Sequence, residues 1–248
     1  MRDSALEEYL KTVDLHSVLH ELGAQNIDFH LEAIRHFTKE EAEKRDKIVL
    51  GYFGEDGVKQ IVDAIVKSLS FPPNALILDI GAGSGFFTTK VADRLKSLPN
   101  ASFYAMDVTP AMLLALIRKT DRIIPFLGLS ENIMGSIENA KKYADVPEQF
   151  DAVFSTLMLH HCADVDRVFQ SLRRVLKSSG KAVIVDLCTH VFTEFKEEMG
   201  DLHLGFDPEQ IGQAGKKVFS TVSVEKMPGI CCESSGRSAE LFIATLEP

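Results

Sequence analysis

The feature that most restricts the fold is a short apolar run that ends in a glycine-rich turn. Residues 76–80 read Leu-Ile-Leu-Asp-Ile, and residues 81–85 read Gly-Ala-Gly-Ser-Gly. The run follows the breaker sequence Phe-Pro-Pro-Asn at residues 71–74, so it begins a new element. Apolar residues then recur at helical spacing through Leu98. The pattern predicts a buried strand, a glycine turn and a helix, with room for a flat ligand on the turn's backbone.

The residues around the turn separate the classes of nucleotide site. A dinucleotide fingerprint needs Gly or Ala at position 86, where this chain has Phe86. A phosphate loop needs Gly-Lys followed by Ser or Thr, which is also absent here. The chain does have Asp79 before the glycines and Asp107 after the next apolar run, residues 101–106. A carboxylate at the end of a second strand can accept hydrogen bonds from both hydroxyls of a ribose.

These features resemble the class I S-adenosylmethionine-dependent methyltransferases, in particular their small-molecule, quinone-methyltransferase-like branch. The resemblance runs from about Asn74 to the C-terminus and covers residues 76–85, 105–108, 150–167 and 173–185, in the family's order. It implies a Rossmann-like α/β fold with a seven-stranded, mostly parallel sheet and an antiparallel last strand. It also implies S-adenosylmethionine as cofactor, with S-adenosylhomocysteine as product.

The resemblance also implies a set of cofactor-binding residues at the strand ends. Near the adenine the family commonly has aspartate where this chain has Ser136, which can still accept one hydrogen bond. The third strand stays open between residues 123–127 and 132–135, because Pro125 and Gly128 interrupt the pattern. The implied residues are Asp79, Gly81, Ala82, Gly83, Gly85, Phe86, Asp107, Val108, Met112, Ser136, Ile137, Ser155 and Thr156.

A general base is the one catalytic side chain that the chemistry can require. In-line methyl transfer from a sulfonium depends mainly on alignment and exclusion of water. An oxygen, nitrogen or carbon acceptor can still need a base, and His160 and His161 follow the expected fourth strand. We favour His160, because related quinone methyltransferases carry a polar residue there that faces the substrate; the alternative is that both histidines are structural. No metal site is predicted, since His16 and His20 lack a third ligand.

The chain is expected to divide into an N-terminal helical cap, residues 1–56, and a cofactor-binding domain, residues 57–248. Thr38 and Glu41 form a capping box, and residues 58–69 carry a wide apolar stripe that should pack on the sheet. In the family such N-terminal helices often cover the cofactor and shape the substrate pocket. Simple covering of the core is the alternative.

The C-terminal half is expected to complete the sheet. Residues 150–159 read as the fourth strand, and Gly180 is expected to end the following helix before a fifth strand at residues 181–187. Residues 218–225 and 239–246 read as the last two strands, joined by a connection that contains Cys231 and Cys232.

Composition limits the partners. The net charge of -9 argues against a nucleic-acid groove, so a small-molecule acceptor is expected. No apolar run approaches membrane-spanning length and the N-terminus has no signal core, so we expect a cytoplasmic protein without membrane contact; a homodimer is left open. The cysteines read as reduced thiols, and a thiol-handling or soft-metalloid site at Cys231 and Cys232 is the alternative.

Two other functions remain open at this point. A non-catalytic S-adenosylmethionine-binding protein with a regulatory or assembly role would bind the cofactor without turnover. A dehydrogenase would need nicotinamide binding, against which Phe86 argues.

Overall fold

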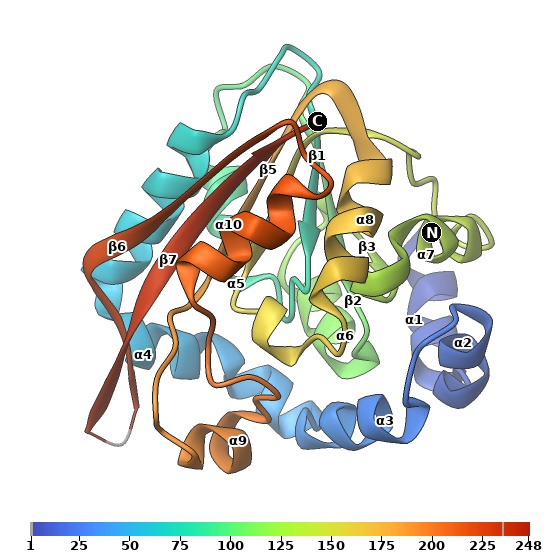
Figure 1. Cartoon of the computed structure of the whole chain (residues 1–248). Coiled ribbons are helices and arrows are strands. Elements are labelled where there is room, and N and C mark those ends of the chain that lie inside the picture. Colours follow the sequence, from blue (N-terminus) through green and yellow to red (C-terminus); the bar gives the residue numbers. More distant parts are fainter. Residues whose placement is uncertain (1, 235) are drawn as a thin grey trace.

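Seven strands form one sheet in the order β3-β2-β1-β4-β5-β7-β6 (Figure 1). The computed structural model describes residues 2–234 and 236–248, apart from the side chains of residues 2–4, 29, 33, 36 and 197–199. Only β7 runs antiparallel to its neighbours β5 and β6, so the expected fold class is confirmed. The strands are β1 (Leu76–Ile80), β2 (Ser102–Asp107), β3 (Ile123–Leu127), β4 (Phe150–Thr156), β5 (Leu176–Leu187), β6 (Thr221–Ser234) and β7 (Arg237–Glu247).

Helices cover both faces of the sheet, as a largely parallel sheet requires. The C-terminal half of α4 packs with α5 and α6 on one face, and α7, α8 and α10 pack on the other. The helices are α1 (Arg2–Thr12), α2 (Leu15–Glu21), α3 (Ile27–His36), α4 (Lys39–Ser68), α5 (Phe86–Arg94), α6 (Pro110–Lys119), α7 (Ile133–Ala140), α8 (Val165–Val175), α9 (Glu194–Met199) and α10 (Pro208–Lys216), with short 3-10 turns η1 (Ser130–Asn132) and η2 (Leu159–His161). Among the described residues, no helix has both the length and the apolar character that crossing a membrane would need.

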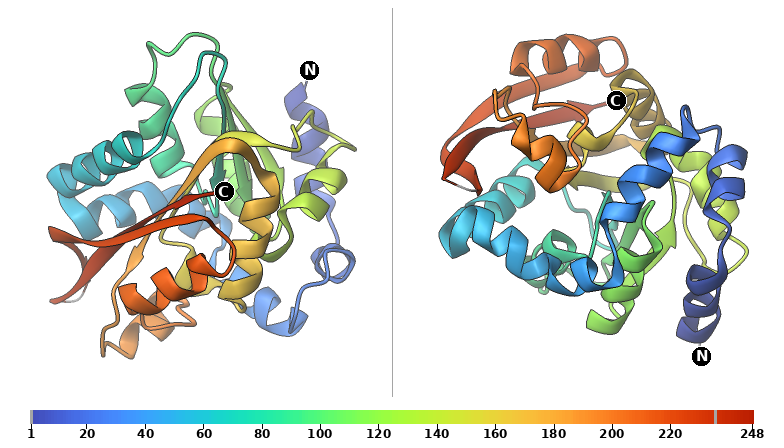
Figure 2. Two further views of the ribbon diagram at one scale, coloured as in Figure 1. Left: turned by 45° about the horizontal axis from the view of Figure 1, so that its top comes forward. Right: turned by 90° about the horizontal axis from the view of Figure 1, so that it is seen from below.

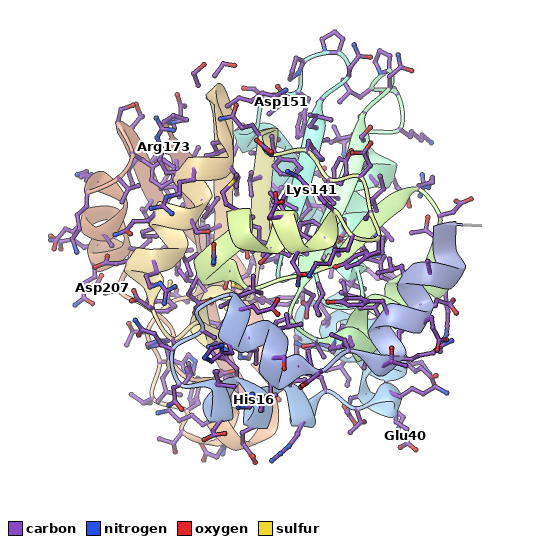
Figure 3. All side chains as sticks on the ribbon, turned by 90° about the vertical axis from the view of Figure 1, so that its right-hand side faces the viewer. His16, Glu40, Lys141, Asp151, Arg173 and Asp207 are labelled. Atoms are coloured by element: carbon purple, nitrogen blue, oxygen red, sulfur yellow. The ribbon has the colours of Figure 1, made fainter. Side chains whose placement is uncertain are left out.

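The N-terminal helices lie at the carboxyl end of the parallel strands. In Figure 3, Asp151 at the start of β4 is at the top, and Glu40 at the start of α4 is at the bottom. The right-hand view of Figure 2 shows α1 to α4 together with α9 on the side that faces the viewer. Apolar residues of α1 and α2, among them Leu10 and Leu19, are buried against Leu113 of α6 and Leu127 of β3. These helices therefore close one end of the sheet.

Helix α4 joins the two expected stripes into one element. The Thr38 hydroxyl accepts the N–H of Glu41 at 3.3 Å, which confirms the cap. The helix changes direction at Gly54, which has φ 63° and ψ 174°, and then continues to Ser68. The boundary drawn between residues 56 and 57 falls inside α4, and the division into a cap and a domain stays a prediction.

Three expectations about strands are corrected. The third strand is β3, and the alternative at residues 132–135 is wrong because those residues begin α7. Gly180 lies within β5 rather than ending α8; a Cβ there would come within 2.9 Å of the Phe150 carbonyl oxygen, so the close strand contact requires glycine. The strand β6 is longer than expected, so Cys231 and Cys232 belong to it and not to a connection.

Candidate functional site

A pocket opens where β1, β2, β3 and β4 end and α3 and α4 cover them. Its floor comes from the glycine turn and the segments after β2, β3 and β4, and its roof comes from the N-terminal helices. The lining residues are His30, Ile34, Phe37, Arg45, Gly81, Gly83, Met106, Asp107, Val108, Thr109, Met112, Gly128, Leu129, Ser130, Glu131, Leu157, Met158, His161 and Cys162.

The backbone of the glycine turn forms the floor of the pocket. Gly81 and Gly83 line it with φ of 68° and 54°, a left-handed conformation that favours glycine. A Cβ on Gly81 would clash with the side chain of Met158, whereas a Cβ on Gly83 would meet no atom within 4 Å. A ligand can therefore lie directly over Gly83. The absence of a side chain at Gly81 leaves space for Met158, which forms the wall of the pocket there.

Asp107 presents a carboxylate to the pocket from the end of β2. One of its oxygens accepts the N–H of Gly83 at 2.7 Å, and the other accepts the N–H of Thr109 at 2.8 Å. Burial raises the pKa of Asp107, and these two N–H groups oppose that rise. Because each carboxylate oxygen has more than one lone pair, both can still accept a hydrogen bond from a bound ligand.

Several of the expected residues support the turn and do not line the pocket. Asp79 is buried, and its carboxylate accepts the Thr88 hydroxyl at 2.5 Å; burial raises its pKa well above the ordinary value. Asp79 thereby joins β1 to α5. The lining also omits Ala82, Gly85 and Phe86, of which Gly85 is the N-cap of α5 and Phe86 is its first residue.

Two of the residues expected near an adenine lie behind the pocket lining. Ser136 and Ile137 lie inside α7 and do not line the pocket. The Ser136 hydroxyl accepts the N–H of Leu129 at 2.9 Å and donates to the carbonyl of Asn132 at 2.8 Å. The segment directly after β3, residues 128–131, lines the pocket instead. If the sequence analysis had placed the third strand at residues 123–127 alone, it would have identified this segment.

Ser155 and Thr156 are also placed behind the lining, within β4. The Ser155 hydroxyl donates to the carbonyl of Ile80 at 2.8 Å, so it ties β4 to β1. The two residues that follow β4, Leu157 and Met158, form the wall. Leu157 has φ 57°, a strained conformation for a branched residue that re-aims the chain at the pocket.

Of the two histidines in η2, His161 lines the pocket and His160 does not. Nδ1 of His160 lies 2.6 Å from Oδ1 of Asp186, and its Nε2 lies 3.4 Å from Oδ1 of Asp201. Burial alone would lower the pKa of His160, but the carboxylates of Asp186 and Asp201 raise it to about 10.

His161 has the opposite electrostatic environment. Burial, and then the charges of His160 and Arg45, lower its pKa well below the ordinary value. Its Nδ1 lies 3.1 Å from the carbonyl oxygen of Gly200, so Nδ1 carries the hydrogen and Nε2 keeps a lone pair. The neutral imidazole that borders the pocket is thus His161, although the sequence favoured His160.

Contacts between α4 and the glycine turn hold the roof on the pocket. The carboxylate of Asp46 accepts the Ser84 hydroxyl at 2.8 Å and pairs with Lys119 at 2.7 Å. Lys119 also donates to the Ser84 carbonyl at 2.7 Å. The neighbouring residue Arg45 reaches the pocket, with its guanidinium 5.4 Å from the centre of the Phe37 ring. Sequence reasoning missed both Asp46 and Arg45.

The cysteines do not form a site of their own. All four are free, and the one group of described residues with the geometry of a metal-ligand set does not include Cys231 or Cys232. The soft-metalloid alternative finds no support in the described residues.

Comparison with known proteins points to one family of domains. Residues 78–184 match the model of a methyltransferase domain. The chain is 30% identical over 162 residues to the biotin biosynthesis bifunctional protein BioHC of Cellvibrio japonicus, which is 64% of this chain and 29% of that protein. It is 31% identical over 134 residues to the malonyl-[acyl-carrier protein] O-methyltransferase of Methylococcus capsulatus, 52% of this chain and 45% of that protein. The chain thus spans less than half the length of these two relatives.

The fold has a close counterpart among solved structures. Phosphoethanolamine N-methyltransferase 2 of Haemonchus contortus, in complex with S-adenosyl-L-methionine, superposes with a TM-score of 0.62 at 18% identity. The match covers 96% of this chain and 60% of that one. The similarity extends over the N-terminal helices as well as the sheet.

Proposed function

We propose that the chain is a class I S-adenosylmethionine-dependent methyltransferase and transfers a methyl group from S-adenosylmethionine to a small-molecule acceptor. The observation that carries the proposal is the pairing of Asp107 with the open backbone at Gly83, 2.7 Å apart on the pocket floor. This pairing offers a carboxylate to a ribose and a bare backbone to the amino-acid part of the cofactor.

We assign the cofactor-binding residues to two groups. Gly81, Gly83, Asp107, Val108 and Met112 line the pocket and would touch the cofactor, with Leu129 and Ser130 replacing the expected adenine contacts. The remaining expected residues would act by holding the turn and the strand ends in place: Asp79, Ala82, Gly85, Phe86, Ser136, Ile137, Ser155 and Thr156.

The reaction needs alignment and a dry pocket more than it needs reactive side chains. The acceptor atom attacks the methyl carbon in line, the carbon–sulfur bond breaks, and its electron pair stays on sulfur as the neutral thioether. The proton on the acceptor atom passes to a base, for which His161 is the candidate at the pocket. Ile34, Phe37 and Met158 supply apolar walls that exclude water around this step.

We propose that the acceptor binds at the end of the pocket bordered by His161. His160, the residue favoured from sequence, is not in the lining, and its ring nitrogens face the carboxylates of Asp186 and Asp201 rather than the pocket. Burial keeps the pKa of His161 low, so its ring is neutral, and its Nε2 lone pair is available to an acceptor bound beside it. His160 lies behind His161, where it pairs with Asp186 and helps to position the His161 ring.

A small acceptor fits the charge and the relatives. The net charge of -9 disfavours a nucleic-acid partner, and the named relatives include an O-methyltransferase and an N-methyltransferase of small or carrier-bound molecules. A cytoplasmic location is proposed because four free cysteines suit a reducing compartment. A homodimer stays a prediction.

Turnover, not binding, tests the proposed function. The full-length protein is incubated with S-adenosylmethionine that carries a labelled methyl group, against panels of small hydroxyl, thiol, amine and carboxylate acceptors. We expect labelled product from one panel, and much less from Asp107→Ala than from the exposed control Asp121→Ala. Cofactor binding with no labelled product in any panel would favour the non-catalytic alternative.

A further inference from the structure

Three side chains next to the pocket converge on one point. His160 and His161 come from η2, and Asp201 comes from the segment just after α9. One ligand atom from each lies within 4.8 Å of the others. Asp201 lies 40 residues after His161 in the sequence, and none of the three residues belongs to the glycine turn.

Both imidazole rings are oriented as metal ligands usually are. A metal-bound histidine commonly donates its other ring N–H to a carboxylate or a backbone carbonyl. Here Nδ1 of His160 faces Asp186 at 2.6 Å, and Nδ1 of His161 faces the Gly200 carbonyl at 3.1 Å. Each ring therefore has its tautomer fixed and its Nε2 left as the ligand atom.

Asp201 provides an independent indication of a missing cation. The residue is 5% exposed, and among the described residues no donor makes a hydrogen bond to either carboxylate oxygen. The nearest nitrogen, Nε2 of His160, lies 3.4 Å from Oδ1, too far and poorly aligned for a good bond. The Asp201 carboxylate thus has an ion-pair contact with the His160 ring but no hydrogen bond among the described residues, and a cation between Asp201 and the two rings would satisfy it.

We propose that Nε2 of His160, Nε2 of His161 and the carboxylate of Asp201 bind one divalent transition-metal ion, with zinc as the best match. Zinc bonds of about 2.0–2.1 Å in a tetrahedron place neighbouring ligand atoms roughly 3.3–3.4 Å apart. The separation of His160 Nε2 from Asp201 Oδ1 is 3.4 Å. Two imidazoles and one carboxylate with an open fourth position are a donor set typical of catalytic zinc. The ion's charge would balance the carboxylates of Asp186 and Asp201, which both lie beside the His160 ring.

This metal site would add to the proposed function, and the role that we give to the ion depends on that function. Because His161 borders the pocket, an ion on its Nε2 would have its open position toward the acceptor, and it would replace the free imidazole as the group that promotes loss of the acceptor's proton. A hydroxyl or thiol bound there would lose its proton at a lower pH than in water, and would be held for attack on the methyl group. The acceptor class is then an alcohol or a thiol that can bind zinc through its oxygen or sulfur.

The test measures the metal directly. The untagged, full-length protein is stripped with a chelator, dialysed and titrated with zinc, and bound metal is measured by elemental analysis. Cobalt substitution gives the visible absorption of the bound ion as a second readout. We expect one ion per chain, and an affinity at least about 100-fold weaker in Asp201→Asn, since even outer residues of metal sites contribute roughly 10–100-fold.

The matched control removes the surface histidines. His16 lies on the exposed surface of α2 (Figure 3), and the double change of His16→Gln and His20→Gln should leave binding unchanged. The proposal is overturned if wild-type protein binds no stoichiometric metal, or if binding survives Asp201→Asn and is lost in the double variant. Should Asp201→Asn fail to fold, His161→Gln provides the same comparison. One bound ion in a protein without methyl transfer would uphold the site and contradict the proposed function alone.

Discussion

Nδ1 of His160 lies 2.6 Å from Oδ1 of Asp186, inside the protein. The same carboxylate accepts the N–H of Leu159 at 2.7 Å and the N–H of Leu187 at 2.7 Å. One buried side chain of β5 thus fixes the turn that follows β4. The position of the two histidines depends on this carboxylate.

Replacing Asp186 by alanine should destabilise the protein strongly. The change leaves two backbone N–H groups and the His160 ring without their acceptor in the interior, which should lower the free energy of unfolding by about 3 kcal/mol or more. Urea denaturation measures the loss. Asp207→Ala removes an exposed N-cap bond to Glu209 and should cost only about 1 kcal/mol. Equal losses would show that the buried carboxylate is not a structural centre.

Replacing Asp107 should weaken cofactor binding without unfolding the chain. The ribose would lose charge-assisted hydrogen bonds worth roughly 1.5–3 kcal/mol each, so Asp107→Ala should bind S-adenosylmethionine at least about tenfold more weakly. Isothermal titration calorimetry provides the affinity, with Asp121→Ala as control. An unchanged affinity would place the ribose elsewhere.

Cofactor affinity should also fall in mild acid. Burial raises the pKa of Asp107, and only the ionised carboxylate can accept from both ribose hydroxyls. As the pH falls through this raised pKa, the carboxyl gains a proton and affinity declines, whereas above it the affinity is level. Titrations at several pH values should show the decline in wild-type protein and a flatter profile in Asp107→Asn. The same slope in both proteins would assign it to another group.

Gly81 should tolerate alanine less well than a glycine of similar conformation in open space. Both Gly81, with φ 68°, and Gly229, with φ 77°, would strain an alanine. Only at Gly81 does the new Cβ also meet Met158, whereas at Gly229 it meets no atom within 4 Å. Gly81→Ala should therefore cost about 1–3 kcal/mol more than Gly229→Ala in thermal or urea unfolding. Similar costs would mean that Met158 moves freely.

The parts of the fold with local signals were predictable from sequence. The run into the glycine turn and the acid at the end of the second strand both rest on neighbouring residues, and both elements lie as expected. The third strand was ambiguous because it contains Pro125. The structure explains the proline, since β3 is an edge strand and pairs only with β2. Ser136 and Ile137, the residues expected near the adenine, lie in α7 and do not line the pocket.

The acceptor side could not be predicted in the same way. The choice of His160 rested on the resemblance to quinone methyltransferases, and the sequence did not show that both histidines belong to a 3-10 turn after the strand. Arg45 and Asp201 reach the site from α4 and from the segment after α9, through contacts that no local pattern encodes. Tertiary packing alone brings them beside the histidines.

Calorimetry with S-adenosylmethionine, S-adenosylhomocysteine and NAD is the most direct test of the central claim, that this pocket binds the methyl donor. We predict one site per chain for the first two ligands, with affinity in the micromolar range of about -8 kcal/mol, and no comparable binding of NAD. A dinucleotide site has Gly or Ala where this chain has Phe86, the first residue of α5. Tighter binding of NAD than of S-adenosylmethionine would contradict the assignment of the pocket.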